Sequence, residues 1–407
     1  MNERALFLEG VRSGRSINLT TLPLDVWPEF EALRRTPQDF QWHAEGNVLT
    51  HTEMVLKECL EVTIDNPGTL LLSALFHDIA KPETTRFDES INHTIAPGHE
   101  RIGGIRSRYL LRELGDSLSN QERREISQLV ATHHLVKRTV KKFEENDPEA
   151  VPFLERLASR VNTKILWALE LADMRGRICV ERPRQIEIVE LFRMLCEERN
   201  VFGKPPTSWL NEQSTSEFNF QSQEAMTYAM RETHRRRLTG EIKNEYQARA
   251  FCHEVARTRK QVPHVIFTIG VSGSGKSYSF AEFADSHERI STDAQRLIKY
   301  GNEARQGKHG PIYQACTEQL IIVLRNGGGA YFDATNIVPD LRSKLVSLCH
   351  AYGALVSFHV FDVSLETAKR RNKERDRKVP EVVIEKQASK FEWPFPEEYH
   401  LIEVIDG

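Results

Sequence analysis

The sequence predicts a multidomain protein in which an all-α N-terminal domain precedes a C-terminal α/β domain built on a parallel sheet. With 407 residues the chain is long enough for two or three domains. Apolar residues recur at helical spacing over residues 1 to about 200, where strand-like, β-branched runs are scarce. From about Pro263, short apolar runs alternate with amphipathic stretches, which is the pattern of strands alternating with helices.

We expect three consecutive parts, at residues 1–203, 204–261 and 262–407. The stretch from Lys204 to Gln223 is polar and opens with two prolines, so it is interpreted as a boundary. Residues 224–260 are charged and helix-prone, which is typical of a helical connector. In the last part the expected strands are HVIFTIG, ERIS, GAYFDA, ALVSFHVFDV and HLIEVID.

The composition indicates an ordinary globular protein. Hydrophobic residues make up 40% and charged residues 28%, and the net charge of −3 argues against a protein that coats DNA by bulk attraction. The six cysteines form no Cys-x-x-Cys pair, and we expect reduced core thiols in a cytoplasmic protein. The N-terminus has no apolar signal segment, and no apolar run approaches the roughly 20 residues of a membrane helix, so we expect no membrane association.

In the helical part, His77 and Asp78 stand inside the apolar run LLLSALFHDIAKP. A buried aspartate costs several kcal/mol unless it is paired. A metal ion between the two side chains can bind both an imidazole nitrogen and a carboxylate oxygen. His51, in NVLTHTEMVL, and Asp173, on the apolar stripe of ILWALELADMRGR, lie in similar surroundings. These four residues are candidates for a first metal shell.

Three further histidines could bind a second metal ion: His99, in APGHERIGG, and His133 and His134, in LVATHHLV. Two ions a few ångströms apart can activate water and stabilise both ends of a phosphoryl displacement. Each residue also has a structural interpretation, because a core histidine is more often hydrogen-bonded than metal-bound. Asp173 could equally pair with Arg175 or Arg177.

In the α/β part, a run fits the phosphate-binding pattern G-x-x-x-x-G-K-[ST] between an apolar strand and a helix. Glycines let the backbone N–H groups point at phosphate oxygens, the lysine reaches the β- and γ-phosphates, and the serine hydroxyl binds Mg²⁺. The predicted nucleotide loop consists of Gly270, Val271, Ser272, Gly273, Ser274, Gly275, Lys276 and Ser277.

Three further clusters of charged residues in this part indicate which group accepts the transferred phosphate. Asp293, at the end of the second expected strand, could accept a proton from an attacking hydroxyl, with Arg296 three residues later on the same helix side. Asp333 ends the next strand and could serve the Mg²⁺ through a water. Arg371 and Arg375, four residues apart, could form a lid over the polyphosphate. The alternatives are a helix N-cap at Asp293, turn chemistry at Asp333 and a solvated charged helix.

These clusters, in this order, resemble the kinase domain of bacteriophage and bacterial polynucleotide kinases over about residues 262–407. The resemblance implies transfer of a γ-phosphate from ATP or GTP, with Mg²⁺, to a 5′-hydroxyl end of RNA or DNA. It makes Asp293 the general base and Arg296 the ligand of the phosphate next to the attacked hydroxyl. Arg371 and Arg375 become lid arginines on the donor phosphates.

The helical part resembles the HD phosphohydrolase superfamily, and is closest to HD domains appended to tRNA CCA-adding enzymes. The motifs that carry the likeness are HAEGNVLTHT, LFHDIAKP, GHE and DMRGR. The resemblance implies one or two divalent transition metals. A mixed histidine and aspartate shell suits Mn, Fe, Co, Ni or Zn about equally. No nucleotidyltransferase domain precedes this region, so CCA addition is not expected. The implied ligands are His51, His77, Asp78 and Asp173, with second-site roles for His99 and one of His133 and His134, preferably His134, and with His43 lining the site.

Together the two parts resemble bacterial HD-Pnk end-healing enzymes. The kinase would provide a 5′-phosphate and the HD domain would remove a 2′,3′-cyclic, 2′- or 3′-phosphate, which prepares RNA or DNA ends for a ligase. Two alternatives remain open at this point: a P-loop kinase for a small metabolite with a nucleotide-hydrolysing HD domain, and a nucleotide-gated RNA-binding sensor. Basic clusters at residues 101–112, 137–142 and 235–237 fit a nucleic-acid substrate, and equally an ordinary solvated surface.

Overall fold

The chain, seen here as a computed structural model, divides into two compact units, Met1–Pro206 and Thr207–Gly407. The structure describes residues 2–19, 27–211, 216–301, 309–375 and 377–407. The segment expected as a connector contributes its helices to the second unit. The three-part division with ends at residues 203 and 261 stays a prediction.

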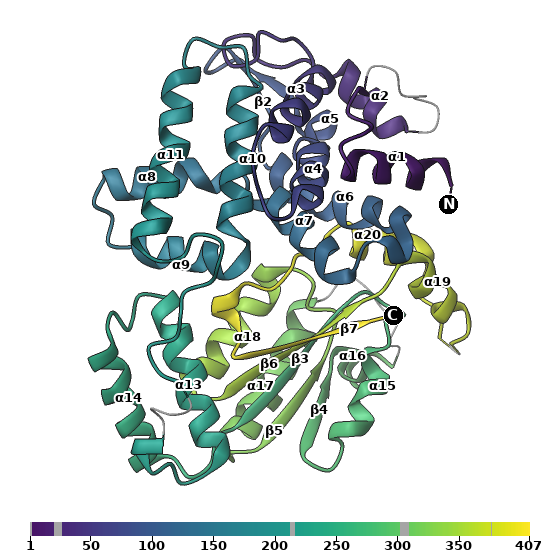
Figure 1. Cartoon of the computed structure of the whole chain (residues 1–407). Helices are drawn as coiled ribbons and strands as arrows, with labels where there is room; N and C mark the ends of the chain where they lie inside the picture. Colours follow the sequence, from purple (N-terminus) through teal and green to yellow (C-terminus); the bar gives the residue numbers. More distant parts are fainter. Residues whose placement is uncertain (1, 20–26, 212–215, 302–308, 376) are drawn as a thin grey trace. The chain divides into compact units, whose positions relative to one another are not determined.

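The first unit is a helical bundle, coloured purple to teal in Figure 1. Helix α4 lies at its centre, because every residue from Gly68 to Phe76 is buried. Asn66 caps the helix through the Thr69 amide, and Pro67 occupies the first turn, where its missing N–H costs nothing. The helices described in this unit are α1 (Glu3–Arg12), α2 (Pro28–Arg35), α3 (Val48–Leu60), α4 (Pro67–Phe76), α5 (Lys81–Thr84), α6 (His99–Leu110), η2 (Leu111–Ser117), α7 (Asn120–Thr132), α8 (Leu135–Glu144), α9 (Ala150–Arg160), α10 (Thr163–Arg175) and α11 (Arg182–Glu198).

A short antiparallel hairpin interrupts the bundle between α5 and α6. Its strands β1 (Arg86–Asp88) and β2 (His93–Ile95) pair Phe87 with Thr94. The side chain of Asp39 attaches the hairpin to the bundle, because its Oδ2 accepts bonds of 2.9 Å from both His93 Nδ1 and the Thr94 amide. We did not expect strands here, since the segment carries no β-branched alternation.

The second unit contains the predicted parallel sheet (Figure 1). Its strand order is β4-β5-β3-β6-β7, and all neighbours run parallel. This is a doubly wound arrangement, in which ligands bind at the carboxyl ends of the strands. All five strands fall on the apolar runs named above. The strands are β3 (His264–Ile269), β4 (His287–Ser291), β5 (Gly329–Asp333), β6 (Leu355–Asp362) and β7 (Leu401–Asp406).

Helices connect these strands, and two preceding helices pack at the sheet. Helices α13 and α14 bury Tyr228 and Cys252 in a small core that also includes Leu355 of β6. His400, directly before β7, holds α13 through a 2.8 Å contact of its Nε2 with Glu232. The helices of this unit are η3 (Ser216–Phe218), α13 (Gln223–Leu238), α14 (Glu245–Thr258), α15 (Lys276–Ser279), η4 (Phe280–Phe283), α16 (Thr292–Tyr300), α17 (His309–Arg325), α18 (Pro339–Ala351), α19 (Leu365–Lys373), α20 (Glu381–Ala388) and η5 (Pro396–Glu398).

All six cysteines are free thiols, and five of them are buried. Among the residues that the structure describes, no helix is long and apolar enough to cross a membrane.

Candidate functional sites

The first unit brings the expected metal ligands together from three helices. His51 lies on α3, His77 and Asp78 follow the last turn of α4, and Asp173 lies on α10. All four are at most 2% exposed. His51 Nε2 is 2.9 Å from Asp173 Oδ1 and 4.0 Å from Asp78 Oδ2, and His77 Nε2 is 3.2 Å from Asp78 Oδ2. Ligand atoms of the first three lie within 4.8 Å of one another, which is compatible with a shared ion.

A recurring hydrogen bond fixes the histidine tautomers in this cluster. The Nδ1–H groups of His77, His99 and His133 donate to carbonyl oxygens three residues earlier, at 2.7, 2.6 and 2.7 Å. In the neutral form of each ring the lone pair is then on Nε2. These three Nε2 atoms are buried and have no hydrogen-bond partner among the described residues. A buried imidazole oriented by its other nitrogen is the arrangement found in metal-ligating histidines.

The second group of histidines is also brought together. Ligand atoms of His99, His133 and His134 lie within 4.8 Å of one another. His99 Nε2 is also 3.2 Å from Asp78 Oδ1, so this group adjoins the first. Burial lowers the pKa of His133 to about 3 and lowers that of His134 well below its usual value, so both imidazoles are neutral near pH 7. Between the two, His133 has the more buried ring and the bare Nε2, whereas the sequence spacing favoured His134.

Side chains that were not singled out from the sequence surround the ligands. Glu45 Oε1 lies 2.7 Å from His43 Nδ1 and 2.9 Å from His51 Nδ1. Lys81 Nζ donates to Asp78 Oδ2 at 2.7 Å. This contact could have been predicted from the sequence, because Lys81 follows Asp78 by three residues, about one helical turn. Burial alone would raise the pKa of Asp78, but the neighbouring His77 ring and the charge of Lys81 hold it well below the usual range.

Asp173 makes the ion pair with Arg177 that the sequence left open. Arg177 donates from Nε to Oδ1 at 3.0 Å and from Nη2 to Oδ2 at 2.6 Å. Because one carboxylate can hold both a guanidinium and a metal ion, the pair does not remove Asp173 from the ligand set. The mixed imidazole and carboxylate donors, with orphaned nitrogens pointing inward, fit a divalent transition metal.

One further acid beside the cluster has no hydrogen bond. Glu170 lies one turn before Asp173 on α10, is fully buried, and neither carboxyl oxygen has a partner among the described residues. Burial, and then the nearby Asp173 charge, raise the pKa of Glu170 to about 8, partly offset by Lys137 and Arg177. Burial beside Arg177 also lowers the pKa of Lys137.

The phosphate loop of the second unit joins β3 to α15. Gly273 and Gly275 have φ values of 83° and 107°, which favour glycine. A Cβ at Gly273 would lie 2.2 Å from the carbonyl oxygen of Ala368 in α19, so only glycine fits there. Gln387 in α20 accepts a 2.8 Å bond from the Ser272 amide. The loop is therefore held between the sheet and the two helices that follow β6.

Lys276 lies under the loop, where its Nζ donates to the Val271 carbonyl at 2.7 Å. Burial lowers the pKa of Lys276 to about 8, partly offset by Asp333. Ser277 Oγ donates to Asp333 Oδ2 at 3.0 Å, which brings together the two expected Mg²⁺ residues. Arg289 on β4 reaches the same Asp333 oxygen, with its Nε at 3.2 Å, and the sequence did not indicate it.

Asp293 stands in the first turn of α16, at the carboxyl end of β4. Ser291, not Asp293, is the N-cap of this helix, since its side chain accepts from the Ala294 amide. Arg296 contacts Asp293 Oδ1. Arg377 donates to Asp293 Oδ2 at 3.0 Å, so a residue beyond α19 contacts the expected base. Arg377 was missed because its partner lies 84 residues away in the sequence.

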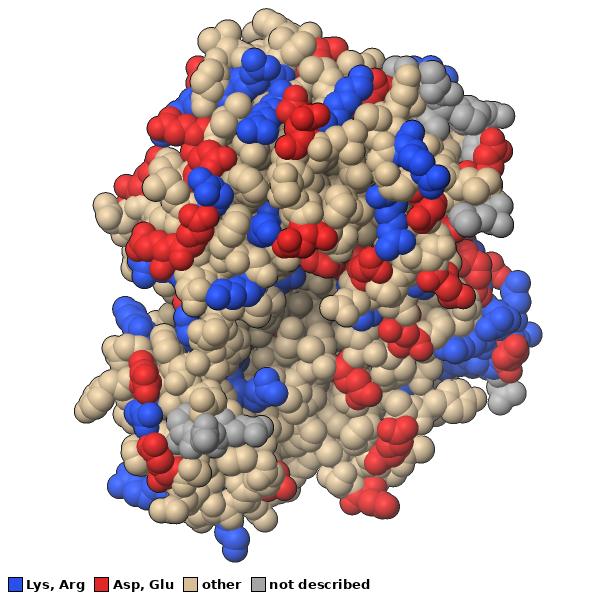
Figure 2. Space-filling view, viewed as in Figure 1, with Lys and Arg blue, Asp and Glu red and all other residues tan. Residues whose placement is uncertain are grey.

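The two expected lid arginines differ in their placement. Arg371 lies on α19 and donates a long, 3.4 Å bond from Nη1 to the Ser274 carbonyl. Arg375 lies beyond the end of α19 at Lys373 and is exposed, so the two do not share one helix face. Burial is the main cause of the lowered pKa of Lys276, and the positive charge of Arg375 adds to it. On the face shown in Figure 2, basic and acidic side chains are interspersed, and the densest basic group lies over α19.

The chain matches two protein families. Residues 48–173 match the HD domain, and residues 265–394 match the AAA domain. A protein of Autographa californica nuclear polyhedrosis virus, named as a bifunctional polynucleotide kinase/RNA ligase, is 30% identical over 147 residues. A bifunctional uridylyltransferase/uridylyl-removing enzyme of Thiobacillus denitrificans is 30% identical over 125 residues. The matches cover 31% and 30% of this chain but only 20% and 13% of those proteins.

Solved structures with some similarity include the Pnkp1/Rnl/Hen1 RNA repair complex, at 23% identity and a TM-score of 0.30 over 33% of this chain and 45% of that one. A gluconokinase from Sinorhizobium meliloti 1021 has 22% identity and a TM-score of 0.27, over 36% of this chain and 83% of that one. These low scores carry no argument about function. From the family matches and the site geometry, the chain combines an N-terminal HD domain with a C-terminal P-loop kinase domain of the AAA type.

Proposed function

We propose that this chain is a bifunctional nucleic-acid end-healing enzyme. The C-terminal unit would phosphorylate 5′-hydroxyl ends of RNA or DNA with ATP or GTP. The N-terminal unit would remove 2′,3′-cyclic, 2′- or 3′-phosphates. The observation that carries the proposal is that one chain holds a phosphate loop beside an arginine-bracketed aspartate, and a separate buried cluster of bare imidazole nitrogens and carboxylates.

In the kinase, the backbone amides of the loop and Lys276 would hold the donor phosphates. Ser277, with Asp333 through a water, would hold the Mg²⁺, which neutralises the phosphate charge. Asp293 would accept the proton of the attacking 5′-hydroxyl. The hydroxyl oxygen then bonds to the γ-phosphorus, and the bond between the γ-phosphorus and the β-phosphate oxygen breaks. Arg371 and Arg375 would stabilise the leaving phosphates.

Arg296 supports a polynucleotide as the acceptor. It contacts Asp293, so a phosphate bound there would lie directly beside the attacked hydroxyl. A polynucleotide provides such a phosphate next to its terminal 5′-hydroxyl, whereas a free nucleoside does not. The name of the viral relative, a polynucleotide kinase/RNA ligase, is consistent with this assignment and with a ligase that joins the healed ends.

In the HD unit, His51, His77, Asp78 and Asp173 would bind one divalent ion, and His99, His133 and His134 would complete a second site. Bound metal supplies an activated water and charge stabilisation for phosphoester cleavage. The residues of the chain set the geometry. Lys81 orients Asp78, Glu45 orients His51, and the backbone carbonyls keep the Nε2 atoms directed inward.

A small-molecule kinase with a nucleotide-hydrolysing HD domain is the competing function, since a P-loop alone does not specify the acceptor. A sensor with little turnover is a weaker candidate, because both clusters keep the residues needed for chemistry. The cytoplasmic location stays a prediction based on the free thiols.

The test uses a short RNA with a 5′-hydroxyl and a 2′,3′-cyclic phosphate, incubated with the protein, ATP or GTP, Mg²⁺ and Mn²⁺. Mass spectrometry of the separated 5′ and 3′ fragments follows each end. We expect Lys276→Ala to abolish 5′-phosphorylation only, and Asp78→Ala to abolish 3′ dephosphorylation only. The exposed substitutions Lys260→Ala and Asp116→Ala are the matched controls. If neither end changes with any donor or metal, the polynucleotide assignment is wrong.

A further inference from the structure

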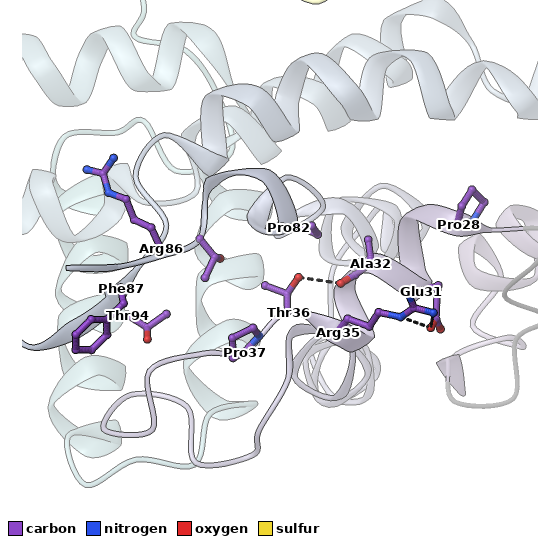
Figure 3. A pocket seen from close by; sticks show the side chains of 11 residues that line it. Pro28, Glu31, Ala32, Arg35, Thr36, Pro37, Pro82, Arg86, Phe87 and Thr94 are labelled. Atoms are coloured by element: carbon purple, nitrogen blue, oxygen red, sulfur yellow. Dashed lines mark hydrogen bonds and ion pairs between the residues drawn. The ribbon is translucent and has the colours of Figure 1, made fainter. Parts of the chain in front are cut away.

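A groove of about 810 Å³ opens in the HD unit between α2 and the β1–β2 hairpin (Figure 3). Its volume falls within the range of about 300–1,000 Å³ typical of small-molecule and cofactor sites. Residues of α2 form one wall, the hairpin forms the other, and a short extended segment with the start of α5 lies between them. The lining residues are Pro28, Glu31, Ala32, Arg35, Thr36, Pro37, Pro82, Thr85, Arg86, Phe87 and Thr94.

The groove is connected to the metal cluster through two of its own segments. Pro37 forms a β-bridge with Asn47, the N-cap of α3, which carries His51 one turn later. Gln38, the next residue after Pro37, accepts a 2.8 Å bond from Lys81 Nζ. The same Nζ donates to Asp78 at 2.7 Å, and Pro82 directly follows Lys81. Pro37 and Pro82 at the base of the groove are therefore the sequence neighbours of Gln38 and Lys81, and Lys81 contacts the metal candidate Asp78.

The walls of the groove have the chemistry that binds single-stranded nucleic acid. Phe87 is 58% exposed although its hairpin is held in place by Asp39, and Figure 3 shows its ring beside Thr94. An exposed aromatic ring can stack on any base. The lining carries two arginines against one acid, so a polyanion meets net positive charge there. Arg35 is 78% exposed and paired only on the surface with Glu31, so it can turn to a phosphate at little cost.

We propose that this groove binds the 3′-terminal nucleosides of a single-stranded RNA or DNA and leads the terminal phosphate to the HD metal cluster. The inference rests on the proposed function, and it adds where the substrate strand lies. The last base would stack on Phe87 between the proline-lined base of the groove and the hairpin. Arg35 and Arg86, at opposite walls, would hold the backbone phosphates.

The experiment compares steady-state dephosphorylation of a 3′-phosphorylated oligonucleotide by the full chain and by hairpin variants. Phe87→Ala is expected to raise KM about 5- to 150-fold, the effect of losing one stacked base, with kcat unchanged. Phe87→Tyr keeps the ring and should restore KM. Ile91→Ala, which removes another exposed apolar side chain of the same hairpin, should leave KM unchanged. Melting temperatures of all variants check that each one is folded.

A second readout does not depend on hydrolysis. A 5′-phosphorylated oligonucleotide with a 3′-terminal 5-iodouridine and a free 3′-hydroxyl is a product analogue for both sites, and it should photocrosslink within residues 85–95. If dephosphorylation proceeds but Phe87→Ala leaves KM unchanged and no crosslink forms there, the groove assignment is wrong while the proposed function stands. If no substrate is dephosphorylated but the crosslink forms and disappears in Phe87→Ala, the groove binds as proposed and the phosphoesterase assignment fails. A nucleoside 3′-monophosphate with a KM as low as that of the oligonucleotide would overturn the polymer assignment.

Discussion

The unpartnered carboxyl of Glu170 should make the stability of the HD unit depend on pH. Its usual pKa is 4.5, and burial raises it to about 8 in the folded chain. The folded state therefore holds a proton that the unfolded state releases between these two pH values, and stability falls as pH rises through this window. Each pH unit in the window costs about 1.4 kcal/mol. Between pH 5.5 and pH 7.5 the loss is about 3 kcal/mol.

Glu170→Gln removes this dependence, because an amide does not titrate while its shape is nearly the same. For a unit of this size, about 1 kcal/mol corresponds to a shift of roughly 2–4 °C in melting temperature. From pH 5.5 to pH 7.5 the wild-type melting temperature should therefore fall by about 6–12 °C more than that of the variant. Any constant cost of the amide beside Lys137 and Arg177 cancels in this comparison.

Circular dichroism melts at the two pH values, with EDTA present so that no divalent ion alters the field, measure the difference. Glu144→Gln is the matched control, since the side chain of Glu144 is 49% exposed rather than buried. Parallel melting shifts for wild type and Glu170→Gln would refute the reasoning, because they would mean that the carboxyl is solvated or already ionised in the folded chain.

Three further outcomes follow from the same geometry. Gly273→Ala should abolish kinase activity and spare dephosphorylation, because the added Cβ would clash with α19. The control Gly301→Ala has a similar φ of 65° but open space around it, so it should cost only about 1–2 kcal/mol of backbone strain and keep the kinase activity. Rate assays of both variants measure the difference. Lys81→Met should lower Mn²⁺ affinity about 10- to 100-fold by freeing Asp78, measured by calorimetry against Lys57→Met; equal affinities would contradict the orienting role. Arg377→Ala should raise KM for the 5′-hydroxyl acceptor about 10- to 100-fold without changing nucleotide affinity, and a loss of nucleotide binding instead would place this arginine with the lid.

The fold class and the five strands could be predicted from the sequence because their signals are local. Each strand is a short apolar run bounded by turn residues, and the helices of the first unit carry apolar residues at helical spacing. The hairpin at 86–95 could not be predicted, because its three-residue strands are exposed or half buried and have no alternation of their own. Asp39, a residue far from it in the sequence, holds it in place.

The candidate site divides in the same way. The ligand histidines and aspartates are recognisable because polar groups in apolar runs require partners. Glu45 and Arg377 act through partners on other elements, and no spacing within their own segments indicates those contacts. For Arg375 the local spacing was misleading. Its four-residue distance from Arg371 predicted that both lie on one helix, but α19 ends at Lys373.

The burial of the candidate metal ligands has a consequence for the release of protons on metal binding. An imidazole that is protonated at neutral pH must release that proton before it can bind an ion, so metal binding usually weakens as acidity rises. His133, with its pKa lowered to about 3, and Asp78, held ionised by Lys81, have no proton to release near pH 7. The bonds that these two residues make to metal would therefore not be lost by protonation in mildly acidic surroundings, where an ordinary histidine becomes protonated.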